Sequence, residues 1–316
     1  MAPNLLKSGL VAGVILLLAG CQQSPVAGGP APSTSPVAGT PVVQTTVPGT
    51  LIYGSDSALA RLHGTTLTRI LQGDAIFNAE ASPDGRHLAY VDDHQRLIEA
   101  NADGTGVRTL RTAAVDAGYG PVWAADSLTL VMAVSQGEQT VPGTLTGKTF
   151  LPLPAALKDY LHFRPTGDGS RLFFTNGECV LFSAKRDGTD LRKVPVLGSQ
   201  DGSVNPKQLR ACDIVSVNAD GSRITVDLHK GDQSDGDIGG SKYANATVDT
   251  ATGTVLRLPV HGTVAQALFR PDGSLLVRTV NGGKGTLTLL SPALAVLATM
   301  AEPAAVKNYN LRDWTR

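Results

Sequence analysis

The sequence predicts an all-β fold, a six-bladed β-propeller whose blades are four-stranded antiparallel sheets. The main evidence is a turn motif that occurs five times, each time before a strand, at intervals of about 40 to 50 residues, a period typical of propellers and solenoids. Segments with helical hydrophobic periodicity are absent beyond the N-terminal apolar run. The 316 residues include 35 glycines and 19 prolines, as expected for many short strands joined by turns.

The clearest copy of the motif is Ser82–Gly85, which precedes the apolar run Leu88–Val91. Proline presets φ for the first corner of a turn, the aspartate side chain accepts a bond from a backbone N–H two residues on, and glycine adopts positive φ. The apolar and β-branched residues that follow are typical of a strand. The turn aspartates of the five copies are 42, 42, 52 and 52 residues apart: Asp84, Asp126, Asp168, Asp220 and Asp272.

Residues 1–21 are predicted to be an export signal that is not part of the fold. A positive charge at Lys7 precedes an apolar run that is too short for a permanent membrane helix. Leu18–Cys21 resembles the lipobox of bacterial lipoproteins, in which the cysteine receives a lipid and becomes the mature N-terminus. We therefore expect Cys21 to anchor the protein to the extracytoplasmic face of the bacterial cell membrane. The alternative is an ordinary signal peptide with a chance cysteine.

Residues 22–50 are predicted to be a disordered tether. They are rich in Pro, Gly, Ser and Thr and contain no charged and no aromatic side chain, so they cannot bury enough apolar surface to become ordered. Residues 51–316 are then the propeller domain, a normal length for a single all-β domain.

Each predicted blade begins with the strand before the turn motif, and three further strands follow outward. The short helix expected in this domain lies near residues 154–160. Residues 51–72 supply three strands and lack an inner one, whereas residues 306–314 supply a single strand. We therefore expect the C-terminal strand to complete the first blade, which removes the open edges of the ring.

The repeat is similar to that of TolB-type (WD40-like) β-propellers, W-S-P-D-G-x-x-I/L-A-F/Y followed downstream by D-G-T. Ser82–Tyr90 with Asn101–Thr105 is the best match, and the resemblance covers essentially all of the domain. The chain departs from the pattern at Ala81, at Asp126–Ser127 and at Thr166–Gly167, which is interpreted as a two-residue insertion. The resemblance implies an extracytoplasmic propeller that usually binds proteins. It transfers no catalytic site, because the motif residues build turns.

Composition restricts the partners and the chemistry. Lys plus Arg and Asp plus Glu number 27 each, so there is no basic stripe for nucleic acid and no polybasic membrane patch. The chain lacks the G-x-S-x-G, H-E-x-x-H, C-x-x-C and Walker A patterns. The predicted function is therefore non-enzymatic binding of a cell-envelope protein or small ligand, without a cofactor. A sensor or accessory domain of an envelope complex is a further interpretation.

Acidic residues stand at the predicted entries of four inner strands: Asp74, Asp116, Asp159 and Asp213. Strand entries converge on one mouth of a propeller, so these carboxylates could share a Ca²⁺ ion. The alternative function is a calcium-dependent hydrolase or lactonase of the six-bladed kind. The simpler interpretation is that aspartate is common at loop ends.

Cys179 and Cys212 are the two cysteines besides Cys21. In an oxidising compartment we expect them to form a disulfide, and two unpaired cysteines in neighbouring blades are the alternative.

The longer spacing of the later turn motifs adds chain in two connections, 198–211 and 230–242. Both should lie opposite the Pro-Asp-Gly turns, and extra loop length on a rigid scaffold predicts a binding face there.

Overall fold

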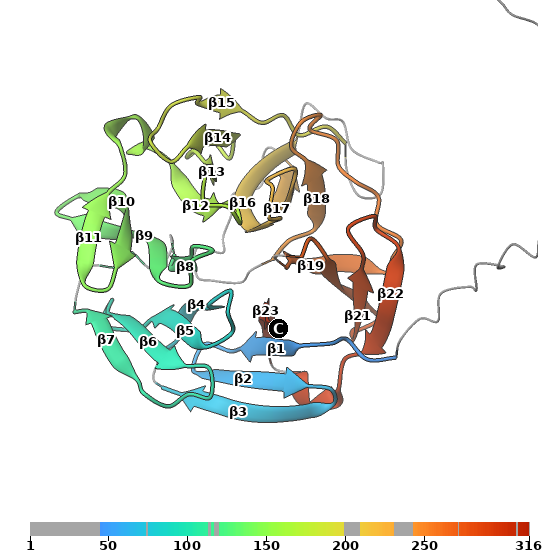
Figure 1. Cartoon of the computed structure of the whole chain (residues 1–316). Helices are drawn as coiled ribbons and strands as arrows, with labels where there is room; N and C mark the ends of the chain where they lie inside the picture. Colours follow the sequence, from blue (N-terminus) through green and yellow to red (C-terminus); the bar gives the residue numbers. More distant parts are fainter. Residues whose placement is uncertain are drawn as a thin grey trace, which may run out of the picture. The chain divides into compact units, whose positions relative to one another are not determined.

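The computed structural model describes residues 45–73, 75–112, 115–116, 120–198, 209–230, 243–270, 272–307 and 309–315. The chain divides into two compact units, Met1–Thr40 and Pro41–Arg316, and every described residue belongs to the second. In that unit the strands β1 to β23 form six antiparallel sheets that follow one another around a ring (Figure 1). The predicted six-bladed propeller is confirmed.

The first three blades are four-stranded, and their strands follow from the innermost outward. Blade one contains β23 (Asn310–Thr315), β1 (Thr50–Gly54), β2 (Ala58–His63) and β3 (Thr66–Gln72). Blade two contains β4 (Phe77–Ala81), β5 (His87–Val91), β6 (Leu97–Asn101) and β7 (Arg108–Arg111). Blade three contains β8 (Val122–Trp123), β9 (Thr129–Gln136), β10 (Gln139–Thr146) and β11 (Thr149–Pro152).

Blades four and six are also four-stranded, whereas blade five has three strands among the described residues. Blade four contains β12 (Leu161–Pro165), β13 (Arg171–Thr175), β14 (Leu181–Lys185) and β15 (Arg192–Lys193). Blade five contains β16 (Leu209–Val217), β17 (Arg223–Lys230) and β18 (Ala246–Asp249). Blade six contains β19 (Thr263–Phe269), β20 (Leu275–Asn281), β21 (Lys284–Leu290) and β22 (Val296–Ala301). On the outer side of β18, the described residues form isolated bridges, such as Val248 with Val255, and no fourth strand.

The two ends of the folded unit meet in blade one. β1 pairs antiparallel with β23, with Thr50 opposite Thr315 and Leu51 opposite Trp314. The predicted closure by the C-terminal strand is confirmed, although the strand begins at Asn310, because Ala304–Val306 forms a 3₁₀ helix. The ordered fold also starts earlier than the predicted boundary, since the side chain of Val47 is already buried.

The turn motif keeps the same length in blade four, so the predicted insertion at Thr166–Gly167 is wrong. The Thr166 N–H donates to the Arg171 carbonyl at 3.0 Å, as the Ser82 N–H donates to the His87 carbonyl at 2.9 Å. Thr166 therefore occupies the position of Ser82, and Pro165 is the last residue of the inner strand. The predicted alignment matched Pro165 to Pro83, which set the start of the motif in blade four two residues too early.

The apolar core lies between the faces of neighbouring blades. Its largest cluster joins blades one and six, where Tyr53, Trp314 and Leu276 are buried. The middle strand β5 is buried on both faces from Leu88 onward, as expected for a strand covered by blades on either side. The predicted short helix is the single 3₁₀ turn Ala155–Leu157. No helix in the described ranges has the length and hydrophobicity needed to span a membrane.

Candidate binding cavity at the ends of the inner strands

A cavity of about 340 Å³ opens where the six inner strands end, next to the turn motifs. Figure 1 shows these strands, β23, β4, β8, β12, β16 and β19, around the centre of the ring. Each inner strand contributes its last residues to the cavity wall. The pairs are Glu80 with Ala81, Val122 with Trp123, Arg164 with Pro165, Ser216 with Val217, Leu268 with Phe269, and Asp313 with Trp314.

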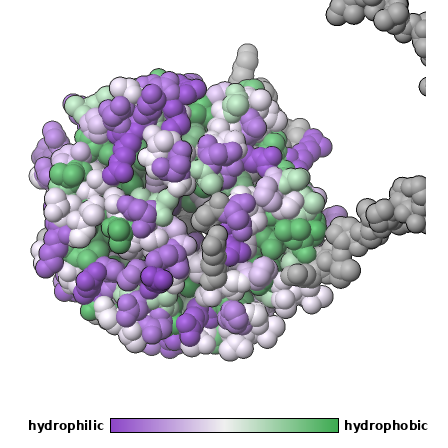
Figure 2. All heavy atoms as spheres, viewed as in Figure 1, coloured by the Kyte–Doolittle hydropathy of each residue, from purple (hydrophilic) through white to green (hydrophobic). Residues whose placement is uncertain are grey.

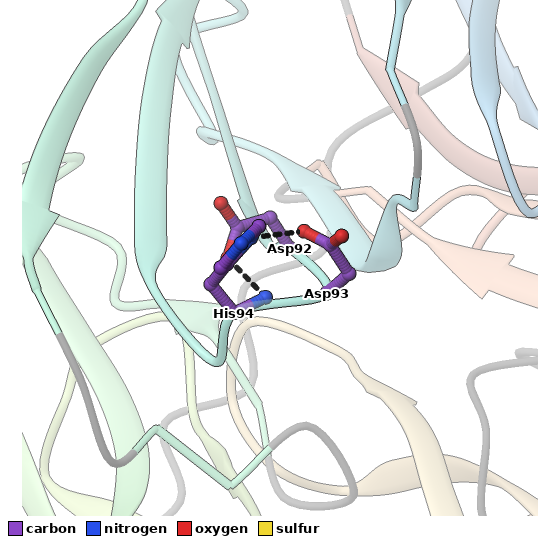
Figure 3. A group of neighbouring side chains, drawn as sticks. All are labelled: Asp92, Asp93 and His94. Carbon is purple, nitrogen blue, oxygen red and sulfur yellow. Dashed lines mark hydrogen bonds and ion pairs between the residues drawn. The ribbon is translucent and has the colours of Figure 1, made fainter.

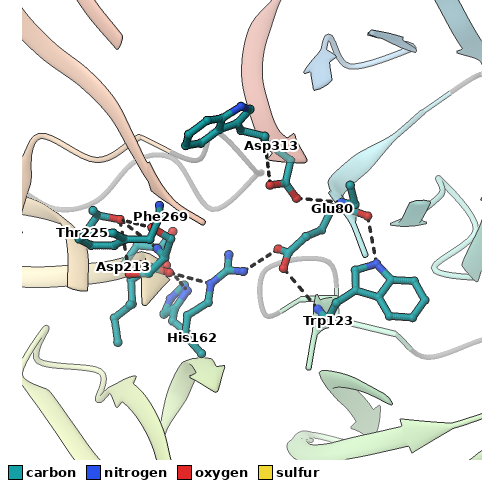
Figure 4. A network of polar contacts seen from close by, with 12 residues as sticks. Glu80, Trp123, His162, Asp213, Thr225, Phe269 and Asp313 are labelled. Atoms are coloured by element: carbon teal, nitrogen blue, oxygen red, sulfur yellow. Dashed lines mark hydrogen bonds and ion pairs between the residues drawn. The ribbon is translucent and has the colours of Figure 1, made fainter. Parts of the chain in front are cut away.

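Polar side chains near the end of three inner strands bind the backbone of the next blade. Asp313 accepts a hydrogen bond from the Ala81 N–H at 2.9 Å, and Glu80 accepts one from the Trp123 N–H at 3.3 Å. Ser216 accepts one from the Phe269 N–H at 2.9 Å. Figure 4 shows these contacts around the channel. These contacts from blades one, two and five to the next blade help to fix the cavity wall.

An ion pair crosses the cavity from blade four to blade two. A terminal nitrogen of Arg164 lies 2.6 Å from Glu80 Oε2, and the two side chains are only 13% and 10% exposed. The Arg164 Nε donates to the Ile214 carbonyl at 2.9 Å. Burial by itself lowers the pKa of Arg164, but the carboxylates of Glu80, Asp213 and Asp313 outweigh it and hold this pKa above its ordinary value. The guanidinium therefore stays charged.

Aromatic side chains form the apolar part of the wall. The indole N–H of Trp123 donates to the Glu80 carbonyl at 3.2 Å, and that of Trp314 to the Pro48 carbonyl at 2.8 Å. The guanidinium of Arg270 lies over the Trp314 ring, 4.4 Å from its centre, in cation–π geometry. Because both indole N–H groups are satisfied, the rings are held in place and offer apolar surface to the cavity.

A histidine–aspartate pair lies beside Arg164. His162 Nδ1 is 3.2 Å from the Asp213 carboxylate, and both side chains are partly exposed. His162 has positive φ, 54°, and lies in the irregular part of β12 between Leu161 and Arg164. Figure 4 shows the two side chains pointing toward one another from adjacent inner strands.

The predicted ring of entry carboxylates does not appear as a group. Asp74 lies outside the described residues, and Asp159 is exposed after the 3₁₀ turn. Asp116 accepts a hydrogen bond from the Thr140 hydroxyl at 3.2 Å, while Asp213 pairs with His162. None of the three belongs to a cluster with metal-ligand spacing in the described part of the chain. The calcium site stays a prediction.

One such cluster does occur within the described ranges, in the β5–β6 turn: Asp92, Asp93 and His94 (Figure 3). Asp92 binds the Arg96 guanidinium at 2.6 Å, and His94 Nδ1 lies 2.6 Å from Asp93. Burial by itself raises the pKa of Asp92, but the hydrogen bonds from the Arg96 side chain and from the Arg96 and His94 N–H groups, with the Arg96 charge, outweigh it and lower this pKa. The cluster is a hydrogen-bonded turn, which explains its geometry without an ion.

Cys179 and Cys212 are joined by a disulfide, as the sequence predicts. It links the β13–β14 turn of blade four to the inner strand of blade five. The Ala211 N–H donates to the Cys179 carbonyl beside it, at 3.1 Å. Most of the two predicted binding connections, 198–211 and 230–242, lies outside the described residues, namely 199–208 and 231–242.

The candidate carboxylates predicted from the sequence lie at the entry ends of the inner strands, whereas the cavity lies at the exit ends of these strands. A usable signal was present, because Glu80, Arg164 and Asp313 are charged residues in strands that should be central. Central strands are normally apolar, so charges near their ends indicate contacts across the channel.

No family model and no curated protein matches this chain. Solved structures do match, among them TolB from Acinetobacter baumannii, with a TM-score of 0.55 and 16% identity over 81% of this chain and 67% of that one. A putative TolB from Agrobacterium tumefaciens has a TM-score of 0.49 and 13% identity, covering 66% of this chain and 76% of that one. A chain of a nidogen/laminin complex has 0.49 and 11%, covering 81% and 98%. The chain thus shares the six-bladed propeller fold of the A. baumannii TolB structure.

Proposed function

We propose that this protein is a lipid-anchored component of the bacterial cell envelope whose propeller binds a protein or small ligand without catalysing a reaction. The observation that supports this proposal is the cavity at the ends of the inner strands, where residues from all six blades converge, aromatic rings and hydrogen-bonded charges among them. Concave, largely apolar sites with a few fixed polar groups are the usual form of ligand-binding sites.

The character of the surface agrees with this proposal. Figure 2 shows hydrophilic side chains over most of the displayed face, with smaller hydrophobic areas between them. Single exposed apolar residues are normal on such a surface. The indole rings of the cavity wall are themselves buried, with Trp123 6% and Trp314 4% exposed, so they give the cavity a fixed shape.

The binding role is tested by photo-crosslinking in cells. Ala125 is exposed and lies at the cavity rim, whereas Thr149 is equally exposed on the outermost strand of the same blade. A photoreactive residue at position 125 should give a discrete cross-linked partner that mass spectrometry identifies. The same residue at position 149 is the matched control. Identical adducts from both positions, or none from position 125, would contradict binding at the cavity.

The anchor is tested by Cys21→Ser in the full chain, with Ser24→Ala as the control. We expect the variant to leave the membrane fraction or to accumulate as a larger precursor. A lipid contributes about 0.8 kcal/mol of membrane affinity per buried CH₂, so a modification with several acyl chains holds the protein firmly. Membrane fractionation and gel mobility read out the result. A variant that behaves like the wild type in both would rule out lipidation at this cysteine.

A further inference from the structure

We propose that the cavity selects ligands that carry a carboxylate on an apolar body, and that Arg164 binds this carboxylate. This inference rests on the proposed function, because it concerns the same cavity and names the chemical class of its ligand.

The first argument is the state of the Arg164 guanidinium. Its Nε donates to the Ile214 carbonyl, and one terminal nitrogen binds Glu80. The second terminal nitrogen makes no hydrogen bond to any described residue, while the side chain lines the cavity. This nitrogen is therefore a charged donor available to a ligand, and a guanidinium is the side chain best suited to a carboxylate.

The second argument is that backbone and side-chain donors already occupy the acidic groups of the wall. One oxygen of Glu80 accepts a hydrogen bond from the Trp123 N–H, and the other binds Arg164. The two oxygens of Asp313 accept hydrogen bonds from the Trp314 N–H and from the Ala81 N–H. The carboxylates of blades one and two are thus partnered by groups of the protein. A ligand therefore meets the second terminal nitrogen of Arg164 as the donor.

The third argument concerns the rest of the ligand. The indole rings of Trp123 and Trp314, with Phe269 and Leu268, give the cavity an apolar wall. A volume of about 340 Å³ lies at the lower end for ligand pockets, which corresponds to a small molecule or one to two amino-acid side chains. A free apolar acid and the C-terminal residue of a peptide share this chemistry.

Glu80 should act as an internal competitor for the ligand carboxylate. In the free protein it neutralises Arg164, because a buried unpaired guanidinium is costly. A ligand carboxylate adds a second anion to the same guanidinium, so removing the charge of Glu80 should favour the ligand. The expected order of affinity for an acid is therefore Glu80→Gln above the wild type, and the wild type above Arg164→Gln.

Tryptophan fluorescence reports on this cavity alone, because Trp123 and Trp314 are the two tryptophans of the chain. The probes are N-acetylphenylalanine and its amide, and a tetrapeptide ending in phenylalanine with a free or an amidated C-terminus. The full-length protein should bind each acid at least about tenfold more tightly than the matching amide, as expected for one charge-assisted hydrogen bond. Tighter binding by the single amino acid favours a free acid as the natural ligand, and tighter binding by the peptide favours a chain terminus.

Three variants sharpen the result. Arg164→Gln should remove the preference for acids, Glu80→Gln should increase it, and Arg192→Gln, an exposed arginine on the outer strand β15 of the same blade, should leave it unchanged. If Arg164→Gln does not fold, the comparison of acid with amide in the wild type still tests the preference for a carboxylate.

Equal binding of acid and amide would overturn this inference and leave the proposed function standing, because cross-linking at position 125 tests that function separately. A fluorescence spectrum that no probe changes would overturn it as well.

Discussion

The ring is held together in two different ways at two of its joints. In blade one the chain closes on itself by strand pairing, between β1 and a β23 that lies more than 250 residues later. Between blades four and five a disulfide joins Cys179 to Cys212, which are 33 residues apart. The first joint brings together the ends of the fold, whereas the second links segments that are already close in sequence.

The strand joint is reinforced by a buried polar network. The Tyr53 hydroxyl donates to Glu302 at 2.7 Å, and Arg278 Nε donates to the same carboxylate oxygen at 2.7 Å. Burial and the adjacent Glu302 charge raise the pKa of Tyr53 far above its ordinary value. Blade one is thus fixed to blade six by apolar packing and by hydrogen bonds to a buried carboxylate.

The disulfide joins two blades whose outer edges have little strand pairing among the described residues. The outer strand of blade four has two residues, and blade five has three strands among the described residues. Fewer ladder hydrogen bonds make local opening easier. The covalent link holds the β13–β14 turn to the inner strand of the next blade, whereas the strand joint is held by backbone pairing and a large apolar core.

The largest effect is expected from deleting residues 310–316, which removes β23. The deletion exposes the edge of β1 in blade one and breaks the contact of Asp313 with the Ala81 backbone of blade two. We expect aggregation or a large fall in melting temperature, measured by scanning calorimetry and size-exclusion chromatography. Asn310→Ala, an exposed position on the same strand, is the control. A monomeric truncated protein with an unchanged melting curve would show that β23 does not close the ring.

The next largest effect is expected from the double variant Cys179→Ser, Cys212→Ser. On the chain-entropy model, a disulfide that closes a loop of this length stabilises by about 3–4 kcal/mol. The variant should still fold, because the strand joint is intact, and denaturant titration should show the loss. Adding a reductant to the denatured wild type before refolding should reproduce it. Unchanged stability would mean that the strand joint alone holds the ring.

A smaller effect is expected from Tyr53→Phe. It removes one hydrogen bond to the buried Glu302 and leaves the Arg278 contact, so we expect a loss of about 1.5–3 kcal/mol, as for bonds to charged groups. Tyr309→Phe is the matched control, since its hydroxyl makes no hydrogen bond to a described residue. Equal losses from both substitutions would assign the effect to packing instead of the network.

The smallest effect is expected on the stability of the fold at acidic pH. The Thr166 hydroxyl and the Ser170 N–H and hydroxyl lower the pKa of Asp168 to about 2. The folded-state pKa is below the unfolded value, so this stabilisation is present above about pH 4 and is lost as the pH falls toward 2. Asp168→Asn should flatten the acid limb of the stability profile. Asp56→Asn, in a turn without such bonds among the described residues, should not. A parallel shift in both variants would contradict this cause.

Much of the fold could be predicted because its signals are local. The turn at Ser82–Gly85 is specified by four consecutive residues, and each copy predicts its own strand pair. Ring closure also followed, since the unpaired strands at both ends are visible along the chain. The insertion at Thr166–Gly167 was wrong because an Arg-Pro pair mimics the start of the motif, and hydrogen bonding alone distinguishes the two registers.

The sequence by itself determined the repeat, the number of blades and the pairing of the chain's two ends, because turn propensities and alternating apolar runs act between neighbouring residues. The tertiary structure alone decided which end of the channel holds the cavity. Glu80 and Arg164 are 84 residues apart, and Asp313 reaches the Ala81 backbone across 232 residues. Such contacts depend on the curvature of the closed ring and on the direction of each side chain in it. No spacing along the chain encodes either quantity, so the predicted carboxylates and the observed cavity lie on different parts of the same inner strands.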